Sequence, residues 1–158
     1  MRIQPARRIN RLALLITLLT LLSATAFAQQ KTSDAERQLL YAINQARKAQ
    51  GLPTLQPDEA LATAARTHAQ RMAEQGTISH QLPGEPNLLS RARAAGARFT
   101  WLAENVAEGL SPTSIHQNFM KSPPHRANIL DTNMDSAGIG IAERNGQIFA
   151  VEDFSKAK

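Results

Sequence analysis

The chain has 158 residues, with 18 basic against 13 acidic side chains and no cysteine. This length suits one domain with a hydrophobic core, and the lack of cysteine excludes a fold held by disulfides. Removing residues 1–28 leaves 14 basic against 13 acidic residues, so the composition does not indicate a nucleic-acid partner. The basic residues that this removes are all arginines: Arg2, Arg7, Arg8 and Arg11.

Residues 1–28 have the three parts of a secretory signal peptide. A basic start precedes the apolar run LALLITLLTLL at residues 12–22, and Ala-Phe-Ala at residues 26–28 fits a cleavage site. The run is shorter than the roughly 20 apolar residues that a membrane span needs. We therefore predict a secreted protein, periplasmic or extracellular, with no stable membrane anchor after cleavage.

After the signal peptide, we predict a short tail at residues 29–34 and one domain over residues 35–155. Ser-Asp-Ala-Glu at residues 33–36 is a capping box that starts a helix. Gly51 and Pro53 end this helix. Apolar residues recur between these points at helical spacing: Leu39, Leu40, Ile43 and Ala46.

Two further helices are predicted in the middle of the chain. One starts near Pro57 and closes at Gly76, and its apolar stripe includes His68. A shorter helix is expected over residues 87–95. Residues 99–106 show no clear period and fit an extended segment that leads into a loop.

The C-terminal third contains two helix starts and a hairpin. Ser-Pro at residues 111–112, and again at residues 122–123, matches an N-cap followed by the first helical residue. The segments AGIGIA at residues 137–142 and QIFAVEDF at residues 147–154 are predicted strands, joined by Asn-Gly, a strong hairpin signal. Helices first and a hairpin last predict an α+β domain in which helices cover an antiparallel sheet.

Any chemistry must come from histidines and carboxylates. The sequence lacks HExxH, a Walker loop, GxSxG and a cysteine nucleophile. His68 lies on an apolar stripe, so we predict a core histidine that is hydrogen-bonded to backbone or a neighbour. His116 is predicted to be exposed near the start of its helix, without a role.

Three residues remain as candidates for a site. His80 lies in a polar turn where packing does not explain it, although a solvated loop histidine is the alternative. Glu104 is a carboxylate in a mostly apolar segment and must be paired, either at a site or by backbone N–H groups. His125 would be the third residue of a helix that starts with two prolines, where the helix dipole disfavours imidazolium. It is predicted to be neutral, as a metal ligand must be, unless it only packs or caps the turn.

Five segments, in this order, resemble the CAP superfamily of cysteine-rich secretory proteins, antigen five and pathogenesis-related proteins (the SCP-like domain), in a bacterial cysteine-free form. They cover roughly residues 35–154: LLYAINQARKAQGLPTLQPDEAL, AARTHAQRMAEQGTISH, AENVAEG, SPPHRANIL and GIGIAERNGQIFAVEDF. The resemblance implies a three-layer α–β–α sandwich with a small, mainly antiparallel sheet. It also implies a central cleft that holds two histidines and up to two acids.

The resemblance matches His80 and His125 to the two histidines and Glu104 to the acid of a Glu-Asn pair. The family's second acid has no counterpart in the helix at residues 113–121, and Glu152 stands where a glutamine is common. Some members bind a divalent metal through the two histidines. The resemblance therefore implies weak binding of Zn²⁺ or another divalent cation at His80 and His125.

Three functions are consistent with these features. The first is a secreted, monomeric binding or interaction module for an envelope, lipid or protein ligand, where a lipid would need a separate apolar groove. The alternative is a metal-assisted hydrolase of peptide or cell-envelope material, with Glu104 as general base. The third is a structural envelope protein with a vestigial cleft. The missing second acid favours the binding module over the hydrolase.

Overall fold

The computed structural model describes residues 32–158, which form one unit. The predicted signal peptide and residues 29–31 of the predicted tail lie outside the described residues, so the domain boundaries stay predictions. No helix in the described part is long and apolar enough to cross a membrane. The elements in chain order are α2 (Asp34–Ala49), β1 (Gln56–Pro57), α3 (Glu59–Gln75), α4 (Leu88–Ala94), β2 (Phe99–Gly109), α5 (Pro112–Lys121), α6 (Pro123–Ile129), β3 (Ser136–Arg144) and β4 (Gln147–Ala157).

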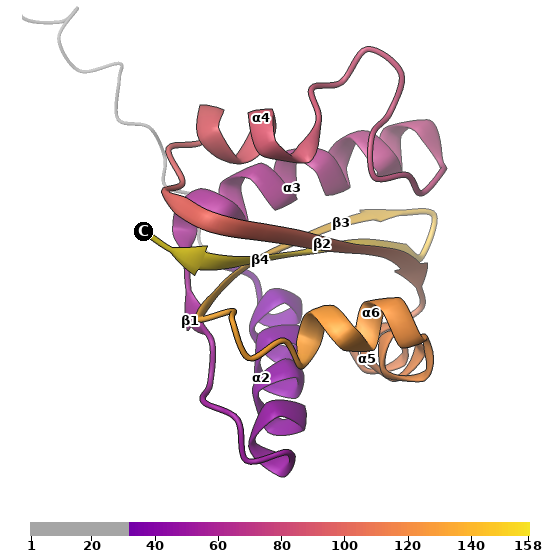
Figure 1. Cartoon of the computed structure of the whole chain (residues 1–158). Helices are drawn as coiled ribbons and strands as arrows, with labels where there is room; N and C mark the ends of the chain where they lie inside the picture. Colours follow the sequence, from indigo (N-terminus) through magenta and orange to yellow (C-terminus); the bar gives the residue numbers. More distant parts are fainter. Residues whose placement is uncertain (1–31) are drawn as a thin grey trace, which may run out of the picture. The chain divides into compact units, whose positions relative to one another are not determined.

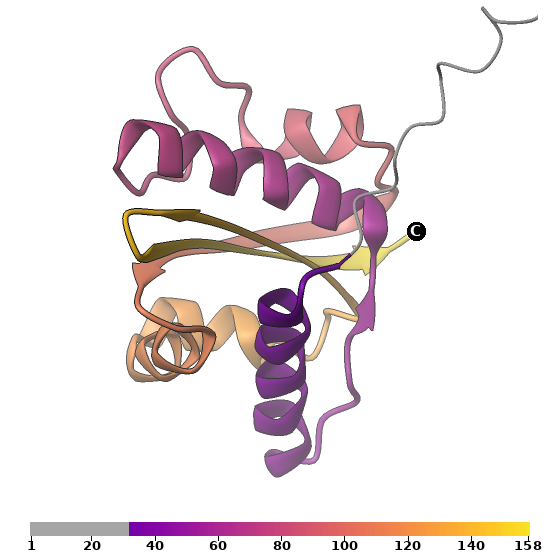
Figure 2. The ribbon, with the colours of Figure 1, turned by 180° about the vertical axis from the view of Figure 1, so that it is seen from behind.

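The sheet lies between two layers of helices (Figure 1, Figure 2). Its strand order is β1-β3-β4-β2, with β1 parallel to β3 and the other two pairs antiparallel. Helices α3 and α4 lie on one face, and α2, α5 and α6 lie on the other. The predicted α–β–α sandwich with a mainly antiparallel sheet is therefore confirmed.

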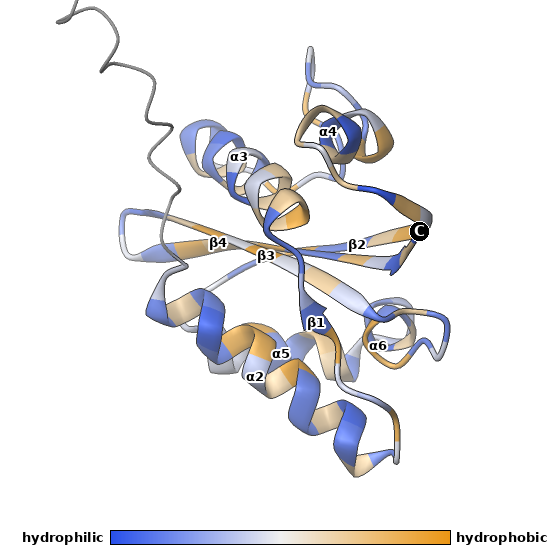
Figure 3. Cartoon of the chain, turned by 90° about the vertical axis from the view of Figure 1, so that its left-hand side faces the viewer, coloured by the Kyte–Doolittle hydropathy of each residue, from blue (hydrophilic) through white to orange (hydrophobic). Residues whose placement is uncertain are grey.

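The predicted helix starts depend on side-chain caps that the structure contains. Ser33 Oγ accepts from the backbone N–H of Glu36 (3.2 Å), and the Glu36 carboxylate accepts from the N–H of Ser33 (2.8 Å). Hydrophobic and hydrophilic residues alternate along α2 in Figure 3, as in an amphipathic helix. Asp58 caps α3, which begins after Pro57 because Gln56 and Pro57 form the short strand β1.

Residues 99–106, predicted to lead from an extended segment into a loop, belong to one continuous strand, β2. This strand pairs with β4 at Phe99 and from Trp101 to Gly109, and the register shifts between Phe99 and Trp101. Residues 104–106 are all buried, since neighbouring elements cover both faces of the strand there. The alternation of apolar and polar residues that marks a half-exposed strand is therefore absent from this part of the sequence.

The hairpin between β3 and β4 has the turn that its sequence predicts. Asn145 and Gly146 both have positive φ, 52° and 77°, as a type I′ turn requires. Two other glycines, Gly138 and Gly140, let α3 lie directly on the backbone of β3. A Cβ on Gly140 would lie 2.1 Å from the carbonyl carbon of Ala65, and one on Gly138 would lie 2.2 Å from the backbone nitrogen of Ala62.

Replacing Gly140 with alanine is expected to lower the free energy of unfolding by about 1–3 kcal/mol. The new methyl group meets helix backbone, which cannot rotate away. Gly109→Ala is the matched control, because its Cβ would meet the side chain of Ile115 (2.7 Å), which can change rotamer. Urea denaturation of both variants measures the difference, and an equal loss in the two would contradict this account of the α3–β3 contact.

Arg47 ties the segment that follows α6 to helix α2. Its side chain is completely buried, so its donors must be satisfied within the protein. It donates to four backbone carbonyl oxygens: Nε to Pro53 (2.8 Å), Nη1 to Ile129 and Asp131 (2.9 Å each) and Nη2 to Met134 (3.2 Å). This clamp holds the C-terminal end of α6, the helix that carries His125.

Candidate functional site

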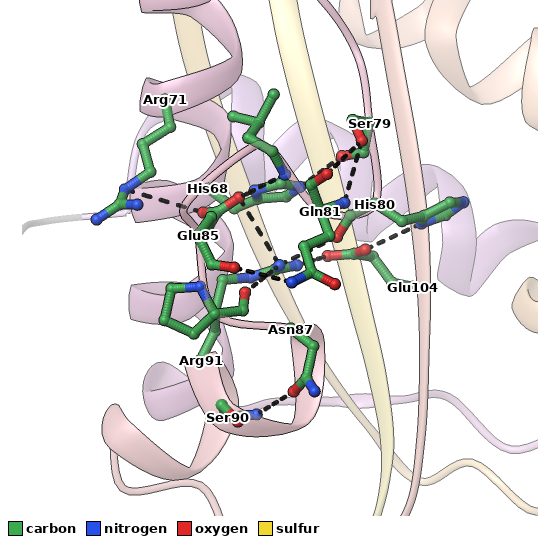
Figure 4. A network of polar contacts seen from close by, with 12 residues as sticks. His68, Arg71, Ser79, His80, Gln81, Glu85, Asn87, Ser90, Arg91 and Glu104 are labelled. Atoms are coloured by element: carbon green, nitrogen blue, oxygen red, sulfur yellow. Dashed lines mark hydrogen bonds and ion pairs between the residues drawn. The ribbon is translucent and has the colours of Figure 1, made fainter.

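His80 lies in the loop of residues 77–87 between α3 and α4, and its side chain is 63% exposed. Its Nδ1 lies 2.9 Å from Oε1 of Glu104 (Figure 4). Because a carboxylate accepts rather than donates, this contact places the ring hydrogen on Nδ1. The other ring nitrogen, Nε2, is then the one that can bind a metal or accept a proton.

Glu104 is buried on β2, and side chains from two other elements hold its carboxylate. His80 contacts Oε1, and Arg91 of α4 donates to Oε2 through its Nη2. Both oxygens are thus held by side chains and not by the backbone N–H groups considered as an alternative above. A buried carboxylate paired with a guanidinium is a rigid support, and here it orients the exposed imidazole of His80.

Arg91 was not among the candidates predicted from the sequence, yet it connects the parts of the site. In addition to its bond to Glu104, its Nη1 donates to the carbonyl oxygens of His80 (3.0 Å) and Pro86 (3.1 Å). The signal was available, since Arg91 lies three residues after Leu88 and next to the buried Ala92 on the short helix. An arginine on the inner face of an amphipathic helix indicates a buried ion pair.

His68 holds the other side of the loop, which confirms the prediction of a hydrogen-bonded core histidine. It is fully buried, and its Nε2 contacts the carbonyl oxygen of Ser79 at 2.7 Å. Its Nδ1 lies 2.8 Å from Oε2 of Glu85, at an angle outside hydrogen-bond geometry. Glu85, a buried acid from a polar loop, was also missed, because nothing in its local sequence distinguishes it from solvated neighbours.

His125 is the third residue of α6, as predicted, after Pro123 and Pro124. Burial, and then the charge of His80, lower the pKa of His125, which favours the neutral imidazole. This agrees with the predicted neutral state, but burial and His80, rather than the helix dipole, lower the pKa of His125. The ring also packs edge-on against Phe119, with centroids 5.0 Å apart.

Asn105 fixes the backbone at His125 from the neighbouring position on β2. Its Nδ2 donates to the carbonyl oxygen of His125 (3.1 Å) and to Oε2 of Glu152 (2.9 Å), while its Oδ1 accepts from Asn128 (2.9 Å). Successive side chains of a strand point to opposite faces. Glu104 therefore serves His80 on one side of the sheet, and Asn105 serves His125 on the other.

Two acids on β4 lie directly across from these residues. Glu104 is opposite Asp153, and Asn105 is opposite Glu152. Burial raises the pKa of Glu152 to about 8, partly offset by the hydrogen bond from Asn105. Burial, and then the carboxylate of Glu104, raise the pKa of Asp153 well above its ordinary value. The burial of Asp153 and the neighbouring carboxylate of Glu104 therefore both favour the protonated form of Asp153.

The fourth histidine does not belong to the site. His116 is half-buried, so the prediction that it is exposed is wrong, and burial lowers its pKa. The helix α5 packs against α2 and the sheet, which covers more of its surface than its first turn suggested. Within residues 32–158, no three His, Cys, Asp or Glu side chains are grouped as a metal cluster. A metal at His80 and His125 would have these two as its protein ligands.

A three-layer α–β–α domain with two histidines on either side of a Glu-Asn strand defines the class of protein. The chain belongs to the cysteine-rich secretory protein (CAP) family, whose model matches residues 40–154. The family predicted from the sequence, and its cysteine-free form, are thus confirmed.

Three bacterial proteins are among those that the chain resembles. The chain is 30% identical over 135 residues to YkwD of Bacillus subtilis (strain 168), covering 85% of this chain and 52% of YkwD, so it spans about half of that relative. An extracellular protein containing an SCP domain from Bacillus anthracis is 25% identical, with a TM-score of 0.72 over 78% of this chain and 40% of that one. An outer surface protein from Borrelia burgdorferi, 24% identical, shares the fold with a TM-score of 0.74 over 81% of this chain and 96% of that one.

Proposed function

We propose that this CAP-domain protein is a secreted binding or interaction module of the cell envelope, with a labile divalent-metal site at His80 and His125. The observation that carries the metal site is the contact between His80 Nδ1 and Glu104, which leaves Nε2 of a largely exposed ring available to bind a metal. The predicted signal peptide supports export, as do relatives described as extracellular or outer surface proteins.

The residues present fit a weakly held metal. Neutral imidazole is a preferred ligand of Zn²⁺, and a carboxylate behind a histidine is the usual way to orient such a ligand. Glu104 has this supporting position behind His80. Two protein ligands leave the remaining positions to water, so the site would exchange its metal readily. A bound cation would polarise a ligand or a water at the site.

The position of Glu104 favours binding over hydrolysis. To act as a general base, this carboxylate would have to release a contact with His80 or with the buried Arg91.

Zinc titration by calorimetry tests the metal site. We expect wild-type protein to bind zinc weakly, His80→Ala and His125→Ala to abolish binding, and His116→Ala, the matched control, to leave it unchanged. Glu104→Gln should weaken binding about 10–100-fold, because the support of His80 is altered. Equal binding by wild type, His80→Ala and His125→Ala would sink the proposal. Zinc-dependent release of products from cell-envelope peptides, lost in His80→Ala, would favour the hydrolase instead.

A further inference from the structure

Strand β2 is an edge strand of the sheet. It pairs with β4 on one side and with no strand of the described residues on the other. In Figure 1 it is the foremost strand, with α4 above it and α6 below it. Its second half is covered on the outer side, where Asn128 of α6 donates to the carbonyl oxygen of Glu104 (3.4 Å) and to Asn105. Residues 99–103 have no such cover from the described residues. An uncovered edge presents unpaired N–H and C=O groups.

The uncovered stretch carries exposed apolar side chains. Trp101, the single tryptophan of the chain, is 59% exposed on this strand. Leu89, on the first turn of the adjacent helix α4, is 42% exposed. Exposed aromatic and aliphatic groups beside a free strand edge are a recognised arrangement for docking another chain.

Two hollows flank the same short stretch of β2. One, of about 390 Å³, lies between the start of α4 and the strand, with Leu88, Leu89 and Phe99 in its lining. The other is formed by Thr100 and Trp101 together with Asn133 and Lys156. Helix α4 belongs to one layer, and Asn133 follows α6 of the opposite layer. The hollows therefore offer space at both faces of the sheet edge.

From these observations we infer that residues 99–103 of β2 bind an extended peptide segment of a partner protein as a fifth strand of the sheet. Successive side chains of such a peptide point to opposite faces, so one apolar side chain would enter the α4 hollow while its neighbours face Lys156 and Asn133. An extended backbone can pair with a row of N–H and C=O groups along the edge, which neither a lipid chain nor a bare metal ion can do.

The inference that the partner is an extended peptide rests on the proposed binding function. It does not depend on the proposed metal site. The docking stretch ends where Glu104 begins, so a bound peptide would approach His80 without using it as an anchor. Zinc binding and peptide binding can thus succeed or fail independently of each other.

The test starts from a displayed library of linear peptides selected on the purified protein, whose enriched members are then synthesised. We expect peptides that alternate apolar and polar residues. Their binding should change Trp101 fluorescence and shift the amide NMR signals of residues 99–103. Analogues that are N-methylated at alternate positions lose backbone donors but keep their side chains, and should bind about tenfold more weakly or not at all.

Variants of the protein separate this site from other surfaces. Leu89→Lys should weaken peptide binding about tenfold. Tyr41→Lys, a matched change on the exposed surface of α2, should leave it unchanged. No enriched peptide, signals that shift elsewhere, or equal binding of the N-methylated analogues would overturn the inference. So would self-association through residues 99–103 that excludes peptide, since the edge would then pair with a second copy of the chain.

Discussion

Replacing Arg91 with alanine is expected to destabilise the protein by about 3–5 kcal/mol. Its guanidinium is buried, contacts the carboxylate of Glu104, and lies 3.9 Å from that of Glu85. Removing it leaves the buried carboxylate of Glu104 without its guanidinium and takes a donor from two loop carbonyl oxygens, those of His80 and Pro86. A buried charge that loses its partner retains its desolvation cost and loses the interaction that offsets it.

Arg93→Ala is the matched control, because Arg93 lies on the same helix and is exposed. Urea denaturation followed by circular dichroism should show a change within about 0.5 kcal/mol for the control. Glu104→Gln, added to Arg91→Ala, should recover part of the loss, since a neutral amide does not need the guanidinium. If Arg91→Ala is as mild as Arg93→Ala, the ion pair does not hold the loop of residues 77–87.

The second large effect is a loss of stability as the pH rises through the range in which Glu152 is protonated only in the folded state. Its pKa is about 8 in the fold, against 4.5 as the ordinary value. Between these values the folded state binds more protons than the unfolded state, so the free energy of unfolding falls with increasing pH. The slope is about 1.4 kcal/mol per pH unit, for a total on the order of 4–5 kcal/mol.

Thermal or urea unfolding measured from pH 4.5 to pH 8.5 checks this, with Glu152→Gln as the test variant. An amide has the shape of the protonated acid and does not titrate, so the variant should be more stable than wild type at pH 8 and lose the part of the slope that Glu152 contributes, about 1.4 kcal/mol per pH unit. Asp153 contributes a remaining slope of the same sign. Glu143→Gln, an exposed change on β3, should leave the profile unaltered. A Glu152→Gln profile parallel to that of wild type would contradict the buried neutral acid.

The protonated state of Glu152 also accounts for its departure from the family pattern. The resemblance places a glutamine at this position, and a neutral carboxylic acid is close to it in size and shape. In the structure, Glu152 Oε2 accepts from Asn105, the contact that an amide oxygen would also make. Its Oε1 has no hydrogen-bond partner among residues 32–158, which a neutral acid tolerates better than a carboxylate does.

The candidate site was predicted in part. His80, Glu104 and His125 were selected from a polar turn, an apolar segment and a proline-rich helix start, together with a family resemblance. The structure brings His80 into contact with Glu104 and places His125 within range of the charge of His80. Their metal-binding and catalytic roles stay predictions. Asn105 was missed as a functional residue because its contacts are with residues far away in the sequence, such as His125.

The sequence by itself determined the helices, the hairpin and the family. Their signals are local: the Ser33–Glu36 capping box, the glycine that ends α3, and Asn145-Gly146 with its two positive φ angles. Only the tertiary structure decided how β4 is covered. Because this strand lies between β3 and β2 with helices on both faces, the adjacent acids Glu152 and Asp153 are both buried. In a strand with one exposed face, one of two adjacent side chains points to solvent. The local sequence does not show that helices cover both faces of this sheet.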